Sequence, residues 1–543
     1  MSTAPNAGRA ERHRAVALLA RPWLVTAALA VVYLILAPQS PDLAAASYRS
    51  HLFSQVGYSL WDDSWYGGHH LLAYSLLAPA LGAAIGPALL AALSMVAATG
   101  LFSLTLADRV APRTALLAGL WFAFGASVAL LSSRVPFDLG LAVGLGAVAL
   151  AQRGRVVAAG ALCVLCSAAS PVAGAFLAMA MLAWALAGSA RPARGVLLAL
   201  CLLALAPIAF LSLAFPEGGS QPFVASAFWP ALAGTIVVGL AMPAERRVLR
   251  AGALLYALVL VGSFFIASAV GGNADRLGAL CAGPLAACAL LGAPRRRWAL
   301  LALLAPLTYW QANAPVTDFV STLSNPATGA SYYVPLQREL ARLGIGYGRR
   351  PARVEAVPTV DHWEARYLAA DVMIARGWER QLDRYRNGLF YGSEALTPAS
   401  YRRWLDAQSV SYVALPGASL DYSGKAEARV LAGAAASGAG GFLHEIWSSR
   451  DWRLFAVRSP RPLARGGTLT QAGTQSFTLQ APAAGDYVIK LHFTPYWSLT
   501  RGSGCVARAP GDWTAVRARA PGVLHVAVEF SPARIFSHGP RCD

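Results

Sequence analysis

Residues 195–214 read GVLLALCLLALAPIAFLSLA, a run of twenty residues without a charged side chain. An α-helix rises about 1.5 Å per residue, so this run is as long as the roughly 30 Å hydrocarbon core of a bilayer. Similar apolar runs recur through the first three-fifths of the chain and predict about eleven membrane-spanning helices. They lie at 22–38, 82–106, 114–132, 137–151, 156–170, 172–188, 195–214, 224–242, 249–270, 276–292 and 298–313.

The composition of the whole chain agrees with lipid as its solvent. Of the 543 residues, 56% are hydrophobic and only 13% are charged, against roughly 25% charged in soluble domains. The formal net charge of +18 comes from short basic clusters between the apolar runs and not from one basic face. We therefore expect membrane lipid around the chain and no nucleic-acid partner.

The loops between the predicted helices alternate in charge. One set carries sixteen arginines: Arg9, Arg12, Arg14, Arg21, Arg109, Arg113, Arg153, Arg155, Arg191, Arg194, Arg246, Arg247, Arg250, Arg295, Arg296 and Arg297. The other set carries three, Arg49, Arg134 and Arg276. Because basic loops stay in the cytoplasm, we expect a multi-pass protein of the cell inner (plasma) membrane with a cytoplasmic N-terminus. An odd number of helices then makes the C-terminal domain extracytoplasmic.

The sequence pattern changes after about residue 313, where charged residues become common and no later run could span a bilayer. We predict a polytopic α-helical membrane bundle at 1–313, with a first outer loop at 39–81. An extracytoplasmic α/β domain at 314–464 follows, and a small β-sandwich-like domain at 465–543 ends the chain. Alternating segments punctuated by Gly and Pro predict the strands of that last domain, at 476–480, 486–493, 513–518 and 523–530.

Two cysteines lie in the predicted outer domain, Cys505 and Cys542. An oxidising compartment favours a disulfide between them. Two free thiols are the alternative, because the sequence does not fix the distance between the two residues.

The first outer loop contains the sequence WDDSWYGGHH at 61–70, which is our main site candidate. Asp62 and Asp63 would act as a general base toward a sugar hydroxyl, or would bind a divalent cation such as Mg²⁺ or Mn²⁺. Stacking on sugar rings suits flat aromatic side chains, and the histidines are further candidates for substrate or metal binding. These candidates are Trp61, Trp65, Tyr66, His69 and His70. The alternative is an interfacial aromatic belt with solvated acids.

Two further candidates lie at predicted outer helix ends. Arg276 begins a predicted span with Asn273 close before it, which is suited to binding a lipid phosphate at headgroup level. The alternative is a surface pair between Arg276 and Asp275, or an arginine that snorkels to the interface. Arg134 and Asp138 form the third candidate, with pairing to each other as the simpler reading.

The order of these parts resembles the GT-C fold of integral membrane glycosyltransferases. It comprises a short basic head, one helix, an acidic outer loop, many helices and an outer C-terminal domain. The segments WYGGH at 65–69, YSLLAP at 74–79, HWE at 362–364 and GWERQLD at 377–383 resemble uncharacterised bacterial membrane proteins of this fold. The resemblance implies a polyprenyl-phosphate-linked sugar as donor, Asp62 or Asp63 as the base and Arg276 at the donor phosphate. The chain lacks an oligosaccharyltransferase-type Trp-Trp-Asp triplet, which argues against transfer to asparagine.

We therefore expect a hexosyl- or pentosyltransferase that moves a sugar from a polyprenyl-phosphate donor to a cell-envelope glycan or glycolipid on the outer face of the membrane. A non-catalytic envelope scaffold or carbohydrate-binding membrane protein is the first alternative. A transporter is the second, and it would be expected to carry ionisable residues near the bilayer midplane. The predicted spans have no interior Asp, Glu, Lys or Arg, which argues against a transporter.

Overall fold

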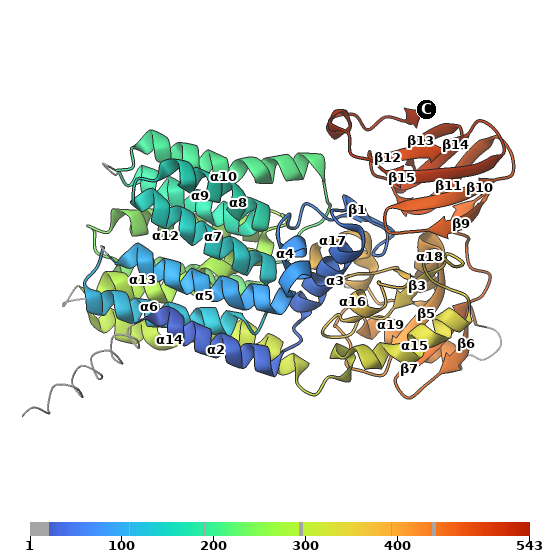
Figure 1. Ribbon diagram of the computed structural model, residues 1–543. Coiled ribbons are helices and arrows are strands. Elements are labelled where there is room, and N and C mark those ends of the chain that lie inside the picture. The colour runs from blue at the N-terminus through green and yellow to red at the C-terminus, as the bar shows by residue number, and fades with distance from the viewer. Residues whose placement is uncertain are drawn as a thin grey trace, which may run out of the picture. The chain divides into compact units, whose positions relative to one another are not determined.

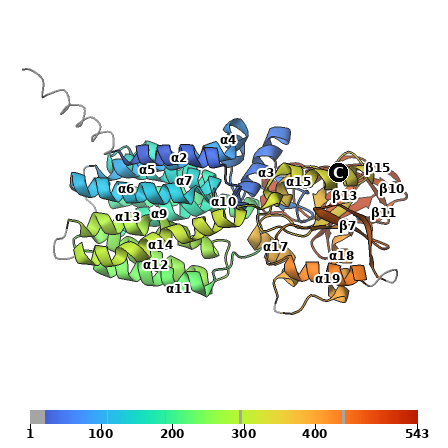
Figure 2. The same ribbon diagram turned by 90° about the horizontal axis from the view of Figure 1, so that it is seen from below.

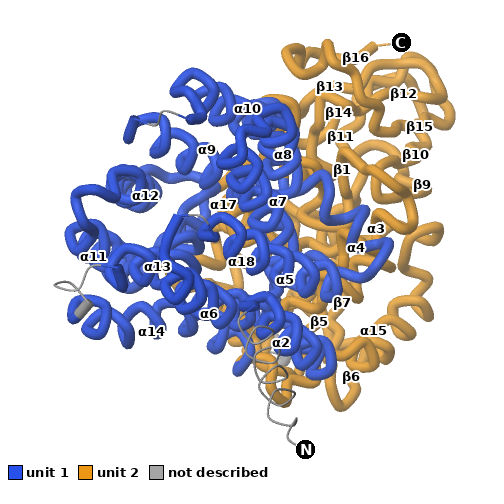
Figure 3. Tube along the Cα trace, turned by 60° about the vertical axis from the view of Figure 1, so that its left-hand side comes forward, with its two compact units in different colours: residues 1–46, 74–210, 220–320 blue, residues 47–73, 211–219, 321–543 orange. Residues whose placement is uncertain are grey.

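The computed structural model describes residues 21–107, 109–188, 191–292, 297–392, 394–436 and 441–542. The chain forms two compact units, which Figure 3 colours separately. The helical unit comprises Met1–Ala46, Tyr74–Phe210 and Ser220–Val320. The strand-rich unit comprises Ser47–Ala73, Leu211–Gly219 and Ser321–Asp543. Neither unit is continuous along the chain.

Apolar helices build the helical unit (Figure 1). They are α2 (Pro22–Leu36), α4 (Ala78–Ile85), α5 (Pro87–Leu106), α6 (Pro112–Ala129), α7 (Val135–Gln152), α8 (Val156–Ala169), α9 (Pro171–Leu186), α10 (Arg194–Ala214), α11 (Ala225–Ala241), α12 (Arg247–Phe265), α13 (Asp275–Leu290) and α14 (Arg297–Thr322). Several begin with a proline at their first position, where its missing N–H costs no helical hydrogen bond. Helix α5 packs against α2 and α7, which lie beside it in Figures 1 and 2, and α7 packs against α8.

Every predicted apolar run is helical, but the predicted count of eleven spans is wrong. Four helices within the described ranges, α5, α7, α10 and α12, are long and apolar enough to cross a membrane. The count is five if α2 and α3 (Pro41–Val56), bent by 80° at their junction, form one broken span. Three of the other runs form shorter apolar helices, α8, α9 and α11. Ser170 caps α9 and separates it from α8, which leaves helices of 16 and 14 residues.

A mixed five-stranded sheet lies in the strand-rich unit, with strand order β4-β3-β5-β7-β6. The strands are β3 (Arg353–Ala356), β4 (Met373–Ile374), β5 (Val410–Pro416), β6 (Leu443–Ser448) and β7 (Trp452–Val457). Strand β3 pairs in parallel with both β4 and β5, and the remaining pairs are antiparallel. The accompanying helices are α15 (Ala330–Arg342), α16 (Glu364–Tyr367), α17 (Arg380–Arg386), α18 (Pro398–Gln408) and α19 (Lys425–Ala436). Val413, Tyr401 and Leu405 lie in the core beside this sheet.

Two antiparallel sheets follow, with strand orders β12-β15-β10-β9 and β16-β13-β14-β11-β8. Their strands are β8 (Ala464–Arg465), β9 (Thr468–Ala472), β10 (Ser476–Ala481), β11 (Gly485–His492), β12 (Trp497–Arg501), β13 (Gly504–Ala509), β14 (Trp513–Ala518), β15 (Gly522–Val528) and β16 (Arg541–Cys542). Phe477 and Leu479 of one sheet share a core with Ile489 and Val516 of the other, which is the packing of a β-sandwich. A disulfide joins Cys505 to Cys542 between β13 and β16.

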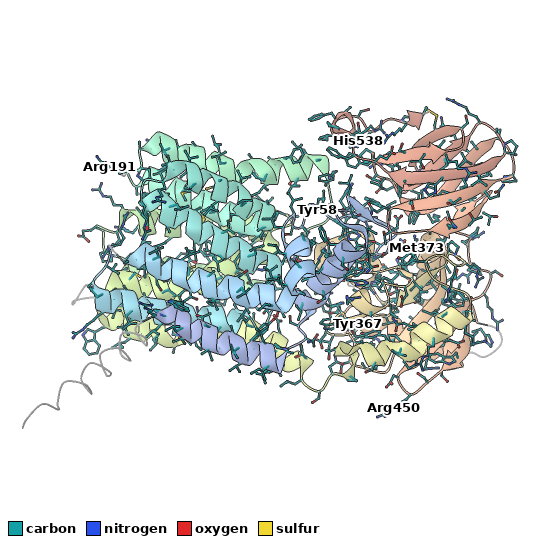
Figure 4. All side chains as sticks on the ribbon, viewed as in Figure 1. Tyr58, Arg191, Tyr367, Met373, Arg450 and His538 are labelled. Atoms are coloured by element: carbon teal, nitrogen blue, oxygen red, sulfur yellow. A yellow bond between two sulfur atoms is a disulfide. The ribbon has the colours of Figure 1, made fainter. Side chains whose placement is uncertain are left out.

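The segment of the predicted first outer loop forms part of the core of the strand-rich unit. A short ribbon of β1 (Trp61–Asp62) and β2 (His69–His70) turns through Gly67 and Gly68, both at positive φ. A Cβ on Gly68 would lie 2.3 Å from the Trp61 ring, so only glycine fits there. The amide of Ile374 on β4 donates to the Ser64 carbonyl. Its neighbour Met373, labelled in Figure 4, is 2% exposed.

Candidate functional site

All seven first-loop candidates are buried in the strand-rich unit. Trp61, Asp62, Asp63, Trp65, Tyr66 and His69 are at most 1% exposed, and His70 is 4% exposed. The structure brings these side chains together in one buried cluster. The expected access to solvent is absent at all seven positions.

Each first-loop carboxyl group is held by neighbours in the same unit. Asp62 accepts hydrogen bonds from the Tyr48 hydroxyl and the Ser64 amide, both at 2.9 Å. Burial raises the pKa of Asp62 to about 6, although these hydrogen bonds favour the charged form. Asp63 accepts from Trp61 Nε1 at 2.7 Å, and burial raises its pKa well above the usual value. Burial thus favours the protonated form of Asp63, which does not suit a general base.

The first-loop rings are also occupied. Tyr48 and His69 both stack on Trp65, with ring centroids 4.5 and 5.3 Å away. The Tyr66 hydroxyl accepts a hydrogen bond from the Glu379 amide. Because none of these rings is exposed, none offers a face to a sugar. Their burial favours a structural role, and the roles in catalysis and sugar binding stay predictions.

The first-loop metal hypothesis has little support in the geometry. Within the described ranges no three or more His, Cys, Asp or Glu side chains converge in a way that could hold a metal ion. His70 is instead engaged by protein groups: its backbone amide donates to Glu217, and its Nε2 lies 3.1 Å from the Thr494 hydroxyl. The mechanism proposed below uses no metal ion.

A second charged cluster lies wholly within the helical unit, around Arg134 at the start of α7. Arg134 Nε donates to Asp42 Oδ2 at 3.3 Å, and its Nη2 lies 3.7 Å from Asp318 Oδ2. The Ser132 hydroxyl donates to the same oxygen of Asp318 at 2.5 Å. The three charged side chains are 25%, 31% and 33% exposed, in the order Arg134, Asp42 and Asp318. This cluster is accessible to a ligand, in contrast to the first-loop acids.

Of the other predicted residues of the helical unit, Asp138 and Arg276 lie near this cluster. Asp138 is 1% exposed, and its Oδ2 has no hydrogen-bond partner within the described ranges. The Arg276 guanidinium lies 5.6 Å from the Phe137 ring and within electrostatic range of Arg134 and Asp138. The predicted pairing of Arg134 with Asp138 is not formed as a salt bridge, because Arg134 bonds to Asp42. Asn273 donates to the Ala269 carbonyl at 3.4 Å and so caps its own turn.

Sequence reasoning did not single out Asp42 or Asp318 as site residues. Asp42 is the first acidic residue after the first helix, and that position was the available signal. Asp318 was missed for a different reason. Helix α14 continues to Thr322 despite Pro306 and Pro315, beyond the predicted end at 313.

A buried ionic network lies beneath the loops that follow β3 and β4. Arg376 bonds to Asp383 at 2.8 Å and lies 3.4 Å from Glu427 and 3.9 Å from Glu355. Burial raises the pKa of Glu427 to about 7 and that of Glu355 well above its usual value. One arginine thus faces three carboxyl groups, and burial favours the protonated forms of Glu355 and Glu427. We read it as part of the core.

No family model matches the chain, and neither does any curated protein. Solved structures of an arabinofuranosyltransferase, AftD from Mycobacteria, match at 15% and 14% identity with TM-scores of 0.40, over 96% and 92% of this chain. They match 60% and 58% of the AftD chain, so this chain spans about three fifths of its length. The archaeal oligosaccharyltransferase AglB from Archaeoglobus fulgidus, solved with an inhibitory peptide and a dolichol-phosphate, matches at 13% identity. Its TM-score is 0.43, over 73% of this chain and 69% of AglB. These structural neighbours are GT-C membrane glycosyltransferases, the class that the sequence resembles.

Proposed function

We propose that the chain is a membrane glycosyltransferase that moves a sugar from a polyprenyl-phosphate donor to a hydroxyl of a cell-envelope glycan or glycolipid. The observation that carries this proposal is the accessible Arg134 cluster at the end of an apolar helix. It combines a carboxylate that could take a proton with arginines that could hold a phosphate.

Arg134 links proton transfer to phosphate binding, because its guanidinium can pair with the carboxylates of the cluster or with a phosphate. Its guanidinium is shared between Asp42 and Asp318, at 3.3 and 3.7 Å. A lipid phosphate that reaches this end of α7 competes with both carboxylates for the same donors. Binding of the donor therefore releases Asp42 from its ion pair and leaves it free to accept a proton.

Asp42 then acts as the general base. It takes the proton of the acceptor hydroxyl while that oxygen forms a bond to the anomeric carbon of the sugar. The bond between this carbon and the phosphate oxygen breaks, and the polyprenyl phosphate leaves with the bonding electrons. Arg134 and Arg276 stabilise the charge that develops on the leaving phosphate. Asp62 and Asp63 are the competing candidates for the base, and the exposure of Asp42 favours it over both.

A transfer assay tests the proposal. The purified full chain in nanodiscs is given radiolabelled polyprenyl-phosphate hexoses and pentoses with envelope glycan and glycolipid acceptors, with and without EDTA. Asp42→Asn should lower turnover by at least about 10²-fold, the usual contribution of a general base. Asp62→Asn and Asp63→Asn should retain transfer.

A matched control is Asp486→Asn, because the Asp486 side chain is 68% exposed on a strand of the sandwich. Transfer retained by Asp42→Asn but lost in Asp62→Asn, with folding intact, would return the base to the first-loop ribbon. No transfer from any donor of the panel would contradict the proposed activity.

A further inference from the structure

The last turn of α10 belongs to the strand-rich unit and packs on the β-sandwich. Helix α10 ends at Ala214, and the Tyr496 hydroxyl donates to the Ala214 carbonyl at 2.6 Å. The centroid of the Phe215 ring lies 5.6 Å from that of Tyr496 and 6.2 Å from that of Phe530. The final carbonyls of a helix have no partner within the helix, so Tyr496 satisfies one of them and fastens the sandwich to the helix end.

The length of α10 sets the height of this contact in a membrane. The 21 residues of α10 make a helix about 30 Å long, at about 1.5 Å per residue. A hydrocarbon core is roughly 30 Å thick, so Arg194 at one surface of the core places Ala214 at the other. Leu213, in the last turn, is 61% exposed, as a lipid-facing side chain would be. Phe530, which packs on Phe215, therefore lies at the boundary between hydrocarbon and headgroups.

An exposed and largely apolar loop at 530–540 follows β15. The Phe536 ring is 82% exposed and the Phe530 ring 47%, and Pro532 is exposed between them. Burial of such rings in an apolar environment is favourable, and aromatic side chains collect at the level of lipid headgroups. The loop thus presents to its surroundings the side chains that suit a membrane interface.

Two arginines hold this loop in shape. Arg534 Nε donates to the Pro495 carbonyl at 2.9 Å, and its Nη2 donates to the Gly539 carbonyl at 2.6 Å. Arg541 pairs at 3.2 Å with Glu529, the acidic residue just before the loop. The loop itself contains no Asp or Glu. Its charge is therefore suited to the phosphates of a headgroup layer.

We propose that the loop at 530–540 rests in the phospholipid headgroup layer, with the rings of Phe530 and Phe536 toward the hydrocarbon, and so anchors the β-sandwich to the membrane. Continuity with the end of α10 selects lipid as the occupant, because a surface at this height meets lipid wherever no other protein chain intervenes. The anchor goes beyond the glycosyltransferase function proposed above and does not depend on it.

Quenching of a fluorophore by lipid tests the anchor. His538, labelled in Figure 4, is an exposed residue of the loop. The full chain with His538→Cys is labelled with the dye NBD under conditions that keep the Cys505–Cys542 disulfide, and is placed in nanodiscs at one chain per disc. Phospholipids that carry a nitroxide near the headgroup should then reduce the emission. The wild type, taken through the same labelling, gives the background from its other cysteines.

The matched control is the label at Val523→Cys. Val523 is 42% exposed on the same sheet, and it lies about 17 Å along β15 from Val528, where the strand leads into the loop. A label there should keep its emission in the nitroxide lipid. Equally strong quenching at 523 and 538 would overturn the proposal, because the membrane would then not select the loop.

Phe536→Glu in the chain labelled at 538 tests the ring itself. A charge at this position opposes entry into the interface, so most of the emission should return in the nitroxide lipid. Val523→Glu, an equal change at the control position, should leave the quenching at 538 unchanged. Both side chains are exposed, so both variants should keep the fold, which circular dichroism checks.

Three results would overturn the anchor. The first is a label at 538 that the nitroxide lipid does not quench. The second is quenching that Phe536→Glu leaves unchanged while the fold is intact. The third is emission at 538 that shifts to shorter wavelength without quenching, because a protein would then cover the loop in place of lipid.

Discussion

Replacement of Asp62 by Asn tests whether this buried carboxyl group costs stability at neutral pH. Burial raises the pKa of Asp62 from 3.8 to about 6 in the folded protein. The folded state then holds the proton more tightly than the unfolded state, so the contribution to stability is fully present below about pH 4 and is lost as pH rises to about 6. A shift of about 2 pKa units at about 1.4 kcal/mol each corresponds to a loss of about 3 kcal/mol.

An asparagine keeps the contacts of Asp62 without the charge. Its carbonyl oxygen can accept from the Ser64 amide, and its amide group can donate to the Tyr48 oxygen, which takes the acceptor role. We therefore expect Asp62→Asn to stabilise the strand-rich unit by about 3 kcal/mol at pH 8 and to change it little at pH 4. Asp486→Asn, at an exposed position, should change it little at either pH.

Hydrogen exchange of peptides covering residues 58–72 measures the free energy of opening at both pH values. A loss of more than about 1 kcal/mol at pH 8 in Asp62→Asn would refute this reasoning, because the charge would then be stabilising. The reasoning would also be refuted if the opening free energies of Asp62→Asn and the wild type differed by the same amount at pH 4 and at pH 8.

Three further changes probe the same unit by chemical denaturation. Trp65→Ala should lower its free energy of unfolding by about 3–5 kcal/mol, because a fully buried indole leaves a cavity; Phe536→Ala, at an 82% exposed ring, should change it by less than about 0.5 kcal/mol. Cys505→Ser removes a disulfide with a sequence separation of 37 and should lower the free energy of unfolding by about 4 kcal/mol. Reduction of the disulfide in the wild type should lower it by the same amount. Arg376→Met leaves buried carboxylates uncompensated and should cost about 3–5 kcal/mol, less below pH 7, where Glu427 takes up a proton.

Local patterns predicted the secondary structure well. The alternating segment at 513–518 is β14, and the run at 195–214 differs from α10 by one residue. Apolar composition locates a helix better than it counts spans, because a run such as 172–188 also includes residues beyond the end of α9 at Leu186. The predicted end at 313 came from the charged residues that become common after it, but α14 continues through Pro315 to Thr322.

The candidate site was only partly predictable, because its chemistry depends on pairing between distant segments. Trp65 forms a bridge with Ile374, more than three hundred residues later, and no local pattern around Trp65 indicates this partner. An isolated WDDSWYGGHH segment has the polar composition of an exposed loop, and only tertiary contacts turn it into core. Arg134 is one of only three arginines in the predicted outer loops, whereas its partner Asp318 lay outside the predicted span.

The discontinuous strand-rich unit imposes an order on biosynthesis. Trp61 and Trp65 leave the ribosome early, but the strand that covers them, β4, is made only after residue 370. At about 5–20 residues per second, translation of the intervening three hundred residues takes about 15–60 s. Throughout this interval Trp65 can stack on Tyr48 and His69, but it lacks its partner Ile374 on β4. The ribbon of β1 and β2 therefore reaches its final packing only when the last third of the chain has been made.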